Sequence, residues 1–277
     1  MNRACATDRS QKGNCHDPTR TPDARKNAGE RDHDVTTATQ SLLPEVLDAH
    51  GGIDRWHHFS KVRSSVVSGG FLWGMKGIPL DDTPRSITSE FRRQWTRVEP
   101  FGQADWHMLY EPHRVVIETQ AGEAVAQQDN PRETFTSHVW ETPWTPLQLA
   151  YFNGYAMWTY YNLPFLLGEP GIETTPIPSI LDDGSVLRGL RVRFPQEIHS
   201  HSPEQSLYFD DSGLLLRQDY EVDIAGRGRA AHLISDYIDV QGLWFPTRRR
   251  VFMRNADGTL QFDKMPVSID LSDFELS

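Results

Sequence analysis

The chain has 277 residues, of which 38% are hydrophobic and 24% charged, an ordinary composition for a globular protein. Its net charge of −10 argues against a nucleic-acid-binding protein, which needs a basic surface, and against electrostatic docking on an anionic membrane. Cys5 and Cys15 are the only cysteines, so the rest of the chain can hold neither a thiolate metal site nor a disulfide. Since no apolar signal segment follows the start either, we expect a cytoplasmic protein.

Residues 1–38 contain no Phe, Trp, Tyr, Leu or Ile, so they cannot bury enough apolar surface to offset the entropy lost on ordering. We therefore predict a disordered tail, followed by a single domain over 39–277. The domain begins with a short helix over 41–52, which Ser41 can cap and which Gly51 and Gly52 can end. Residues 53–59 add one more helical turn.

Most of the remaining chain is predicted to form strands with short connections. The predicted strands are 61–73, 86–100, 105–112, 114–119, 122–128, 186–195, 204–210, 214–223, 229–240, 243–253 and 266–276. Tight turns such as Asp210–Gly213 and Gln241–Gly242 join consecutive strands into an antiparallel meander. The fold class is therefore all-β with minor α: a strongly curved antiparallel sheet, or open half-barrel, of about eleven strands.

The segment 140–167 interrupts the strands and is the most apolar part of the chain. It holds nine aromatic side chains and one charged residue, Glu141. Asn153, Gly154 and Asn162 interrupt it too often for a transmembrane segment, which needs about 20 predominantly apolar residues. Aromatic residues recur at helical spacing up to Pro164, so we predict one helix, a break, and a second short helix. Between two runs of strands, this segment is predicted to be a lid over a cavity.

Two C-terminal stretches resemble a known family. YFDDSGLLLRQDYEVD and HLISDYIDVQGLWFPTRRRVF are similar to the closing strands of the bacterial LolA/LolB/LppX-like group. The matching features are the Asp-x-x-Gly hairpin, Tyr220, Tyr237, Gly242 and the Phe245–Pro246 pair. This resemblance implies a half-barrel over residues 61–277, closed by a helical lid around a cavity for acyl chains. The members of that group work outside the cytoplasm, whereas no signal peptide is visible here, so the resemblance points to an uncharacterised cytoplasmic branch.

The candidate ligand-binding residues come from the lid and from one strand. In the lid they are Trp140, Trp144, Tyr151, Tyr155, Trp158 and Phe165. In the strand 243–253, Arg248 and Arg250 share one face, where two guanidinium groups could hold a carboxylate or phosphate. The alternative is an outward-facing stripe that pairs with Asp219, Glu221 or Asp223 of a neighbouring strand.

The sequence offers two weaker groups with possible chemistry. Asp219, His232 and Tyr237 lie on consecutive strands and could meet on one face for proton transfer. His199, His201 and Glu204 could supply two imidazoles and a carboxylate to a metal, but without a second ligand cluster a polar loop between two prolines is the better explanation. No dinucleotide-binding, P-loop, nucleophile-elbow or HExxH motif is present, so we expect no cofactor and no metal.

The leading functional hypothesis is the binding of a hydrophobic small molecule or lipid under the lid. The alternative is a cofactor-independent isomerase or cyclase acting on an apolar substrate, because the fold also resembles that of the cofactor-free enzyme of the violacein pathway. A third class is a protein-interaction module with an outward aromatic face. We expect no nucleic-acid partner and no transmembrane segment, and the sequence identifies no protein partner.

Overall fold

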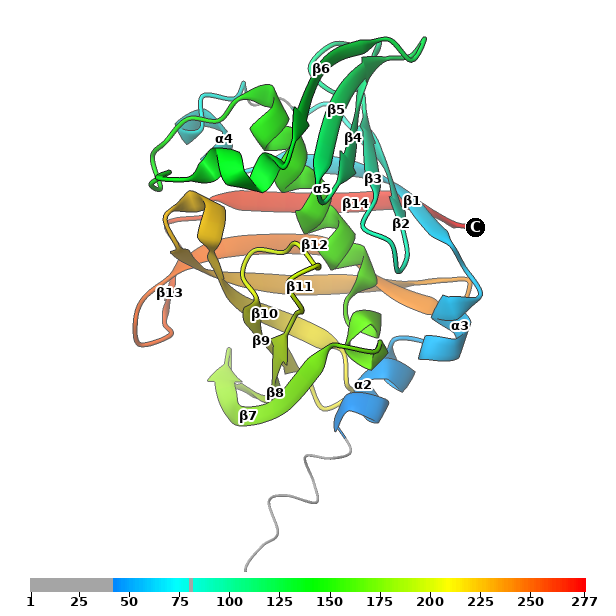
Figure 1. Cartoon of the computed structure of the whole chain (residues 1–277). Helices are drawn as coiled ribbons and strands as arrows, with labels where there is room; N and C mark the ends of the chain where they lie inside the picture. The colour runs from blue at the N-terminus through cyan, green and yellow to red at the C-terminus, as the bar shows by residue number, and fades with distance from the viewer. Residues whose placement is uncertain (1–41, 80–81) are drawn as a thin grey trace, which may run out of the picture. The chain divides into compact units, whose positions relative to one another are not determined.

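The computed structural model describes residues 42–79 and 82–277 (Figure 1). All of them fall within one compact unit, whereas the predicted tail 1–38 and the cap at Ser41 lie outside the described residues. The extent of the predicted domain, 39–277, stays a prediction.

Two short helices precede the sheet, as predicted. Helix α2 spans Leu42–Ala49 and α3 spans Ile53–His57. Between them Gly51 and Gly52 adopt φ values of 110° and 90°, the left-handed region in which a side chain would be strained. The α2 residue Glu45 accepts two hydrogen bonds from Arg188, at 2.6 and 2.7 Å, and this pair ties the helix to the second half of the sheet.

The described residues form one 14-stranded antiparallel sheet made of two meanders. The first meander comprises β1 (Lys61–Gly69), β2 (Arg85–Glu90), β3 (Thr96–Glu99), β4 (Trp106–Glu111), β5 (Arg114–Thr119) and β6 (Ala124–Asp129). The second comprises β7 (Glu173–Asp182), β8 (Ser185–Arg193), β9 (Glu204–Phe209), β10 (Leu215–Val222), β11 (Gly228–Val240), β12 (Leu243–Arg254), β13 (Leu260–Gln261) and β14 (Val267–Leu276).

The two meanders join at their middle and leave two free edges. The strand order is β6-β5-β4-β3-β2-β1-β14-β12-β11-β10-β9-β8-β7, with β13 paired to β12. Strand β1 pairs with β14 from Val62↔Leu276 to Gly69↔Ser268, and β6 and β7 are the edges. The sheet is therefore open, and the predicted curved half-barrel is confirmed.

The strand count differs from the predicted eleven for three local reasons. The predicted strand 86–100 is broken by a turn in which Arg92 has a φ of 62°, so it forms two strands. Strand β7 contains Pro176 and Pro178 and lies where the sequence predicts no strand, but a proline without an N–H donor is tolerated at a sheet edge. The third addition is β13, which is only two residues long.

The segment between the two edges contains the main helix. Helix α5 spans Pro146–Asn162, and the side chain of Thr145 begins it by accepting a hydrogen bond from the backbone N–H of Gln148. It ends before Pro164, and the 3₁₀ helix η2 (Phe165–Gly168) follows, as predicted. Smaller helical segments are α4 (Leu72–Met75), η1 (Pro131–Phe135) and η3 (Asp223–Ala225). Within residues 42–79 and 82–277, no helix is long and apolar enough to cross a membrane.

Helix α5 crosses the concave face of the sheet, between the strands of the first meander and those of the second (Figure 1). Nearly all of its side chains are buried, including Tyr155 and Trp158. At Gly154 the helix lies so close to the sheet that an added Cβ would overlap the ring of Tyr110. The backbone carbonyl of Gly154 also accepts a hydrogen bond from the Thr96 hydroxyl at 3.1 Å. A small residue at this position therefore lets α5 pack closely against the first meander.

We predict that Gly154→Ala destabilises the protein by about 1–3 kcal/mol, because the added methyl group overpacks against Tyr110. This outcome opposes the helix propensity of alanine, which in an open helix stabilises by about 1 kcal/mol. Gly74→Ala in α4 is the matched control, since an added Cβ there meets no atom within 4 Å among the described residues. Urea unfolding of both variants measures the two free energies, and an unchanged or stabilised Gly154→Ala would contradict the close packing.

Candidate ligand-binding site

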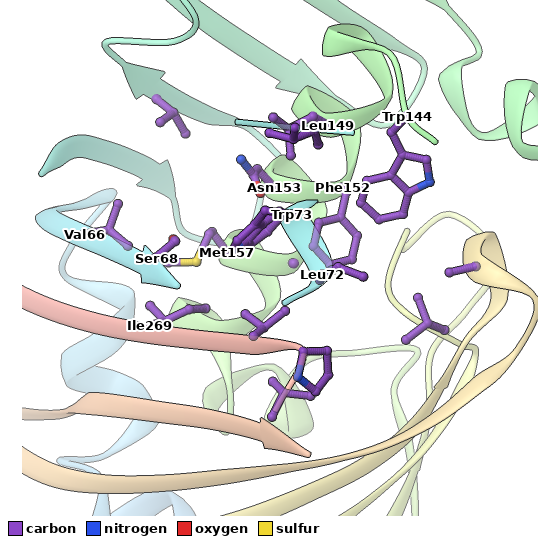
Figure 2. A pocket seen from close by; sticks show the side chains of 18 of the residues that line it. Val66, Ser68, Leu72, Trp73, Trp144, Leu149, Phe152, Asn153, Met157 and Ile269 are labelled. Carbon is purple, nitrogen blue, oxygen red and sulfur yellow. The ribbon is translucent and has the colours of Figure 1, made fainter. Parts of the chain in front are cut away.

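An apolar cavity of about 340 Å³ lies between α5 and the inner face of the sheet. Figure 2 shows Phe152, Asn153 and Met157 of α5 beside Leu72 and Trp73 of α4. The sheet closes the opposite side with inward-facing residues of its central strands, which include Val66, Ile87, Val251 and Ile269.

The lining is apolar apart from a few groups. Among the described lining residues there is no carboxylate, and Arg85 is the one side chain with a permanent charge. The exposed residues Gly77, Pro79 and Gly102 line one end of the cavity, whereas the buried residues His201 and Tyr220 line another part of it. The cavity thus has an outer end near solvent and an inner part with polar side chains.

The two faces of α5 have different roles. Leu149, Phe152, Asn153, Ala156, Met157 and Tyr160 line the cavity at helical spacing. Tyr151 on the other face packs against Tyr110 with ring centroids 5.8 Å apart, and Trp158 borders a separate surface cleft. Because α5 is apolar on both faces, helical spacing alone does not reveal which face meets the cavity.

The predicted ligand residues of the lid are therefore divided. Trp140 and Trp144 line the cavity, whereas Tyr151, Tyr155, Trp158 and Phe165 do not. The ring of Phe165 instead stacks on Trp56 with centroids 5.7 Å apart, which attaches η2 to α3. These four residues pack in the core of the helix and its extension, outside the lining of this cavity, and their contact with a ligand stays a prediction.

Lys76 holds Trp140 and Trp144 in place. Its Nζ donates hydrogen bonds to the backbone carbonyls of Trp140 and Thr142, and lies 4.7 Å from the ring centroid of Trp144. Burial lowers the pKa of Lys76 to about 8, and the charge of Glu141 partly opposes this shift. The ammonium group therefore fixes the wall 140–144 through backbone oxygens and an aromatic face.

His201 is the centre of a buried hydrogen-bond network beside the cavity. The hydroxyl of Tyr155 lies 3.1 Å from its Nδ1 and that of Tyr160 lies 2.7 Å from its Nε2. The ring of Tyr220 stacks on the imidazole at 4.2 Å and 7°. Burial, together with the positive charge of Arg132, lowers the pKa of His201 to about 3. The imidazole is therefore neutral, with one nitrogen that donates and one that accepts.

Two further polar side chains lie behind the Tyr160 ring. The His232 ring centroid is 4.6 Å from that of Tyr160, and the Arg249 guanidinium carbon is 4.9 Å from it. Arg249 donates one hydrogen bond, from Nη2 to the Tyr160 carbonyl oxygen at 2.8 Å. Burial lowers the pKa of both side chains.

Arg248 and Arg250 face away from the cavity, as in the outward alternative, but they pair with Asp236 and Asp270 rather than with Asp219, Glu221 or Asp223. Their role in ligand binding stays a prediction. Arg248 lies 3.2 Å from Asp236, and Arg250 donates to Asp270 at 2.7 and 3.0 Å. Side chains alternate along a strand, so the inward arginine of the triplet is Arg249.

Asp219, His232 and Tyr237 do not meet. Asp219 pairs with Ala231 across the strands, so it faces the opposite side of the sheet from His232. It accepts hydrogen bonds from Arg217 at 2.8 and 3.0 Å. Tyr237 donates its hydroxyl proton to the Leu215 carbonyl at 2.7 Å. The sequence does not fix the pairing of these strands to within one residue, and a shift of one residue moves a side chain to the other face of the sheet.

The three candidate metal ligands also have separate environments. His199 lies 3.0 Å from the Tyr151 hydroxyl, His201 is held by two tyrosines, and Glu204 is exposed, 3.8 Å from Arg193. Over the described ranges, no group of three or more His, Cys, Asp or Glu residues could hold a metal ion. The structure does not bring these residues together as a ligand set.

Comparison with known proteins finds relatives by structure alone. No family model matches the sequence, and no curated protein matches it. A domain described as a putative outer membrane lipoprotein-sorting protein, from Vibrio parahaemolyticus, is similar with a TM-score of 0.50 and 8% identity, over 87% of this chain and 93% of that one. A DUF1329 family protein from Desulfovibrio piger has a TM-score of 0.49 and 12% identity, over 86% and 93%. The likeness to the lipoprotein-sorting domain confirms the predicted LolA/LppX-like fold, and at 8% identity it extends to the fold only.

We predict that His201 makes the protein less stable at acid pH. Its pKa falls from 6.5 to about 3 on folding, so the unfolded chain binds more protons between these values, and the free energy of unfolding decreases as the pH falls below 6.5. The contribution reaches about 1.4 kcal/mol per pH unit. In urea unfolding from pH 7 to pH 4.5, His201→Gln should show a correspondingly shallower slope. His58→Gln, at the surface, controls for the loss of a histidine, and a slope equal to wild type in His201→Gln would show that His201 is protonated in the fold.

Proposed function

We propose that the protein binds a hydrophobic small molecule in the cavity beneath α5. The observation that carries this proposal is the lining, in which aromatic and aliphatic side chains surround about 340 Å³ with very few polar groups. Natural sites for small molecules have this composition, and close-packed protein interiors leave few voids larger than a water molecule.

The cavity volume indicates the size of the ligand. It lies near the lower end of the range of about 300–1,000 Å³ typical of small-molecule sites. A single alkyl chain or a small ring system fits this space better than a lipid with several chains. The aromatic segment 140–167 faces inward, which favours a cavity wall over a surface for a protein partner.

We predict that N-phenyl-1-naphthylamine, an apolar dye that fluoresces in apolar surroundings, binds the protein with a micromolar dissociation constant. Ala156 lines the cavity, and Ala156→Phe fills part of it, so binding should weaken about ten-fold or more. Fluorescence titration measures the dissociation constants, and thermal unfolding shows that each variant is folded.

Ala124→Phe on the exposed edge strand β6 is the matched control, since it adds the same ring outside the cavity. Equal weakening in both variants, or no dye binding by the wild type, would refute the cavity as the site. Cell fractionation tests the cytoplasmic location predicted from the sequence.

A second candidate function is cofactor-independent proton transfer in the same cavity. The supporting observation is that His201, Tyr160 and Tyr220 line the cavity and share a hydrogen-bond network. A neutral imidazole that bridges two hydroxyl groups can take a proton on one nitrogen and release one from the other. Isomerases and cyclases of apolar carbonyl compounds need this chemistry.

We predict for this candidate that the wild type accelerates deuterium uptake at the carbon beside the carbonyl in a panel of apolar ketones dissolved in D₂O. Tyr160→Phe should slow uptake by about 10²–10⁴-fold while dye binding remains. Mass spectrometry follows the exchange. Uptake no faster than in buffer across the panel would favour the binding function.

A further inference from the structure

Arg249 differs from the other arginines of its strand because no carboxylate of the described residues pairs with it. Arg248, Arg250 and Arg254 all lie within 4 Å of an aspartate oxygen, at Asp236, Asp270 or Asp219. Arg249 is 3% exposed and faces the interior, where its one hydrogen bond within 42–79 and 82–277 goes to a backbone carbonyl. Its Nε and Nη1 have no hydrogen-bond partner in these ranges.

His232 presents the same anomaly beside it. The imidazole is fully buried, and neither ring nitrogen has a hydrogen-bond partner in the part of the chain that the structure describes. In the register of β11 and β12, His232 faces Val251 and Arg249 faces Ile234, so the two side chains are diagonal neighbours on the inner face. Four polar nitrogen atoms without partners among the described residues thus gather in one small region of the interior.

This region adjoins the cavity. Val251, two residues from Arg249 on the same strand face, lines the cavity, and so does Ile269, the residue paired with Arg249 across β14. The Tyr160 ring lines the cavity and packs against both His232 and Arg249, which do not line it. The Tyr160 side chain therefore separates the apolar space from the unpaired donors at this point.

An unpaired buried cation is costly, and the usual compensation is an anion with hydrogen bonds to it. The surroundings suit an anion, since the cavity is lined by no carboxylate within the described residues. Among the described residues, the groups that interact electrostatically with Arg249 include four tyrosines and the imidazole of His232; the tyrosines are Tyr160, Tyr161, Tyr220 and Tyr237. One guanidinium beside neutral rings balances one negative charge, which matches a carboxylate better than a phosphate with nearly two.

We propose that Arg249 and His232 form a carboxylate-binding subsite at the inner end of the cavity, so that the ligand is an amphiphile whose acidic head group enters first and whose apolar body fills the cavity. The proposal rests on the proposed binding function and specifies its ligand class. The carboxylate accepts hydrogen bonds from the free guanidinium nitrogens and from one ring nitrogen of His232. Its entry moves the Tyr160 side chain aside and breaks the 2.7 Å contact with His201.

The test compares dodecanoate with 1-dodecanol, which has the same chain and no charge, by displacement of the apolar dye at pH 8. We expect the wild type to bind dodecanoate more tightly than the alcohol. Arg249→Met should weaken the binding of dodecanoate by about ten-fold or more, because charge-assisted hydrogen bonds are lost. The dissociation constant for dodecanol should stay within about three-fold of the wild-type value. His232→Leu should weaken dodecanoate selectively as well, and it keeps the test valid if Arg249→Met does not fold.

Arg85→Met distinguishes the inner subsite from the outer end of the cavity. Dependence of dodecanoate binding on Arg85 with no dependence on Arg249 would place the head group outside and overturn the proposal. Equal affinity of the wild type for dodecanoate and dodecanol would also overturn the carboxylate subsite. It would leave the proposed binding function intact, because that function fails only if the dye does not bind. Tighter binding of dodecyl phosphate than of dodecanoate would reject the carboxylate.

The melting temperature without ligand gives an independent readout. An arginine whose role is to bind a ligand anion contributes little to the stability of the empty protein, so Arg249→Met should melt at or above the wild-type temperature. Dodecanoate should raise its melting temperature by less than that of the wild type. If Arg249→Met melts at a much lower temperature, and His232→Leu keeps the wild-type preference for dodecanoate over dodecanol, Arg249 is a structural residue. A crystal structure with dodecanoate in which the Nε and Nη1 atoms of Arg249 contact only water would lead to the same conclusion.

Discussion

The architecture depends on one topological constraint: the two free edges of the sheet, β6 and β7, are consecutive in the chain. The connection between them has to pass from one edge of a strongly curved sheet to the other. The shorter route lies across the concave face, and a backbone on that route must satisfy its own hydrogen bonds away from water, which a helix does. Helix α5 is this connection. Its aromatic composition follows from its position, because both of its faces lie inside the protein.

The cavity follows from unequal packing of the two faces of α5. On the first meander the helix packs closely, with Gly154 over Tyr110, and tyrosine rings fill the interface. On the central strands β1, β12 and β14 the facing residues are mainly Val and Ile, which are too short to reach the helix everywhere. Where a sheet that curves around one helix carries short side chains, space remains between the sheet and the helix. Polar residues of α5 and of the loop 195–203 lie at the inner part of this cavity.

The sequence predicted the elements better than it predicted the directions of their side chains. Turn residues such as Gly213 and Gly242 located the hairpins, and Pro164 located the break after the helix. The site depends on which face of each strand and of the helix points inward, and local sequence patterns do not decide this. A triplet of arginines indicates that one faces inward, but strand register decides that it is Arg249. Likewise Tyr160 and Tyr155 look alike in the sequence, and only packing shows which one lines the cavity.

The β1–β14 pairing has a consequence for folding. Each meander consists of neighbouring hairpins and can form from local contacts, whereas the seam joins Val62 to Leu276 across more than two hundred residues. Strand β14 is the last described strand to be synthesised, so the first meander emerges from the ribosome with the edge of β1 unpaired. An open edge of this kind readily pairs with another chain. The interval before β14 arrives is therefore when a nascent chain is most exposed to aggregation, and variants that slow closure of the seam lower the yield of folded protein before they alter the finished structure.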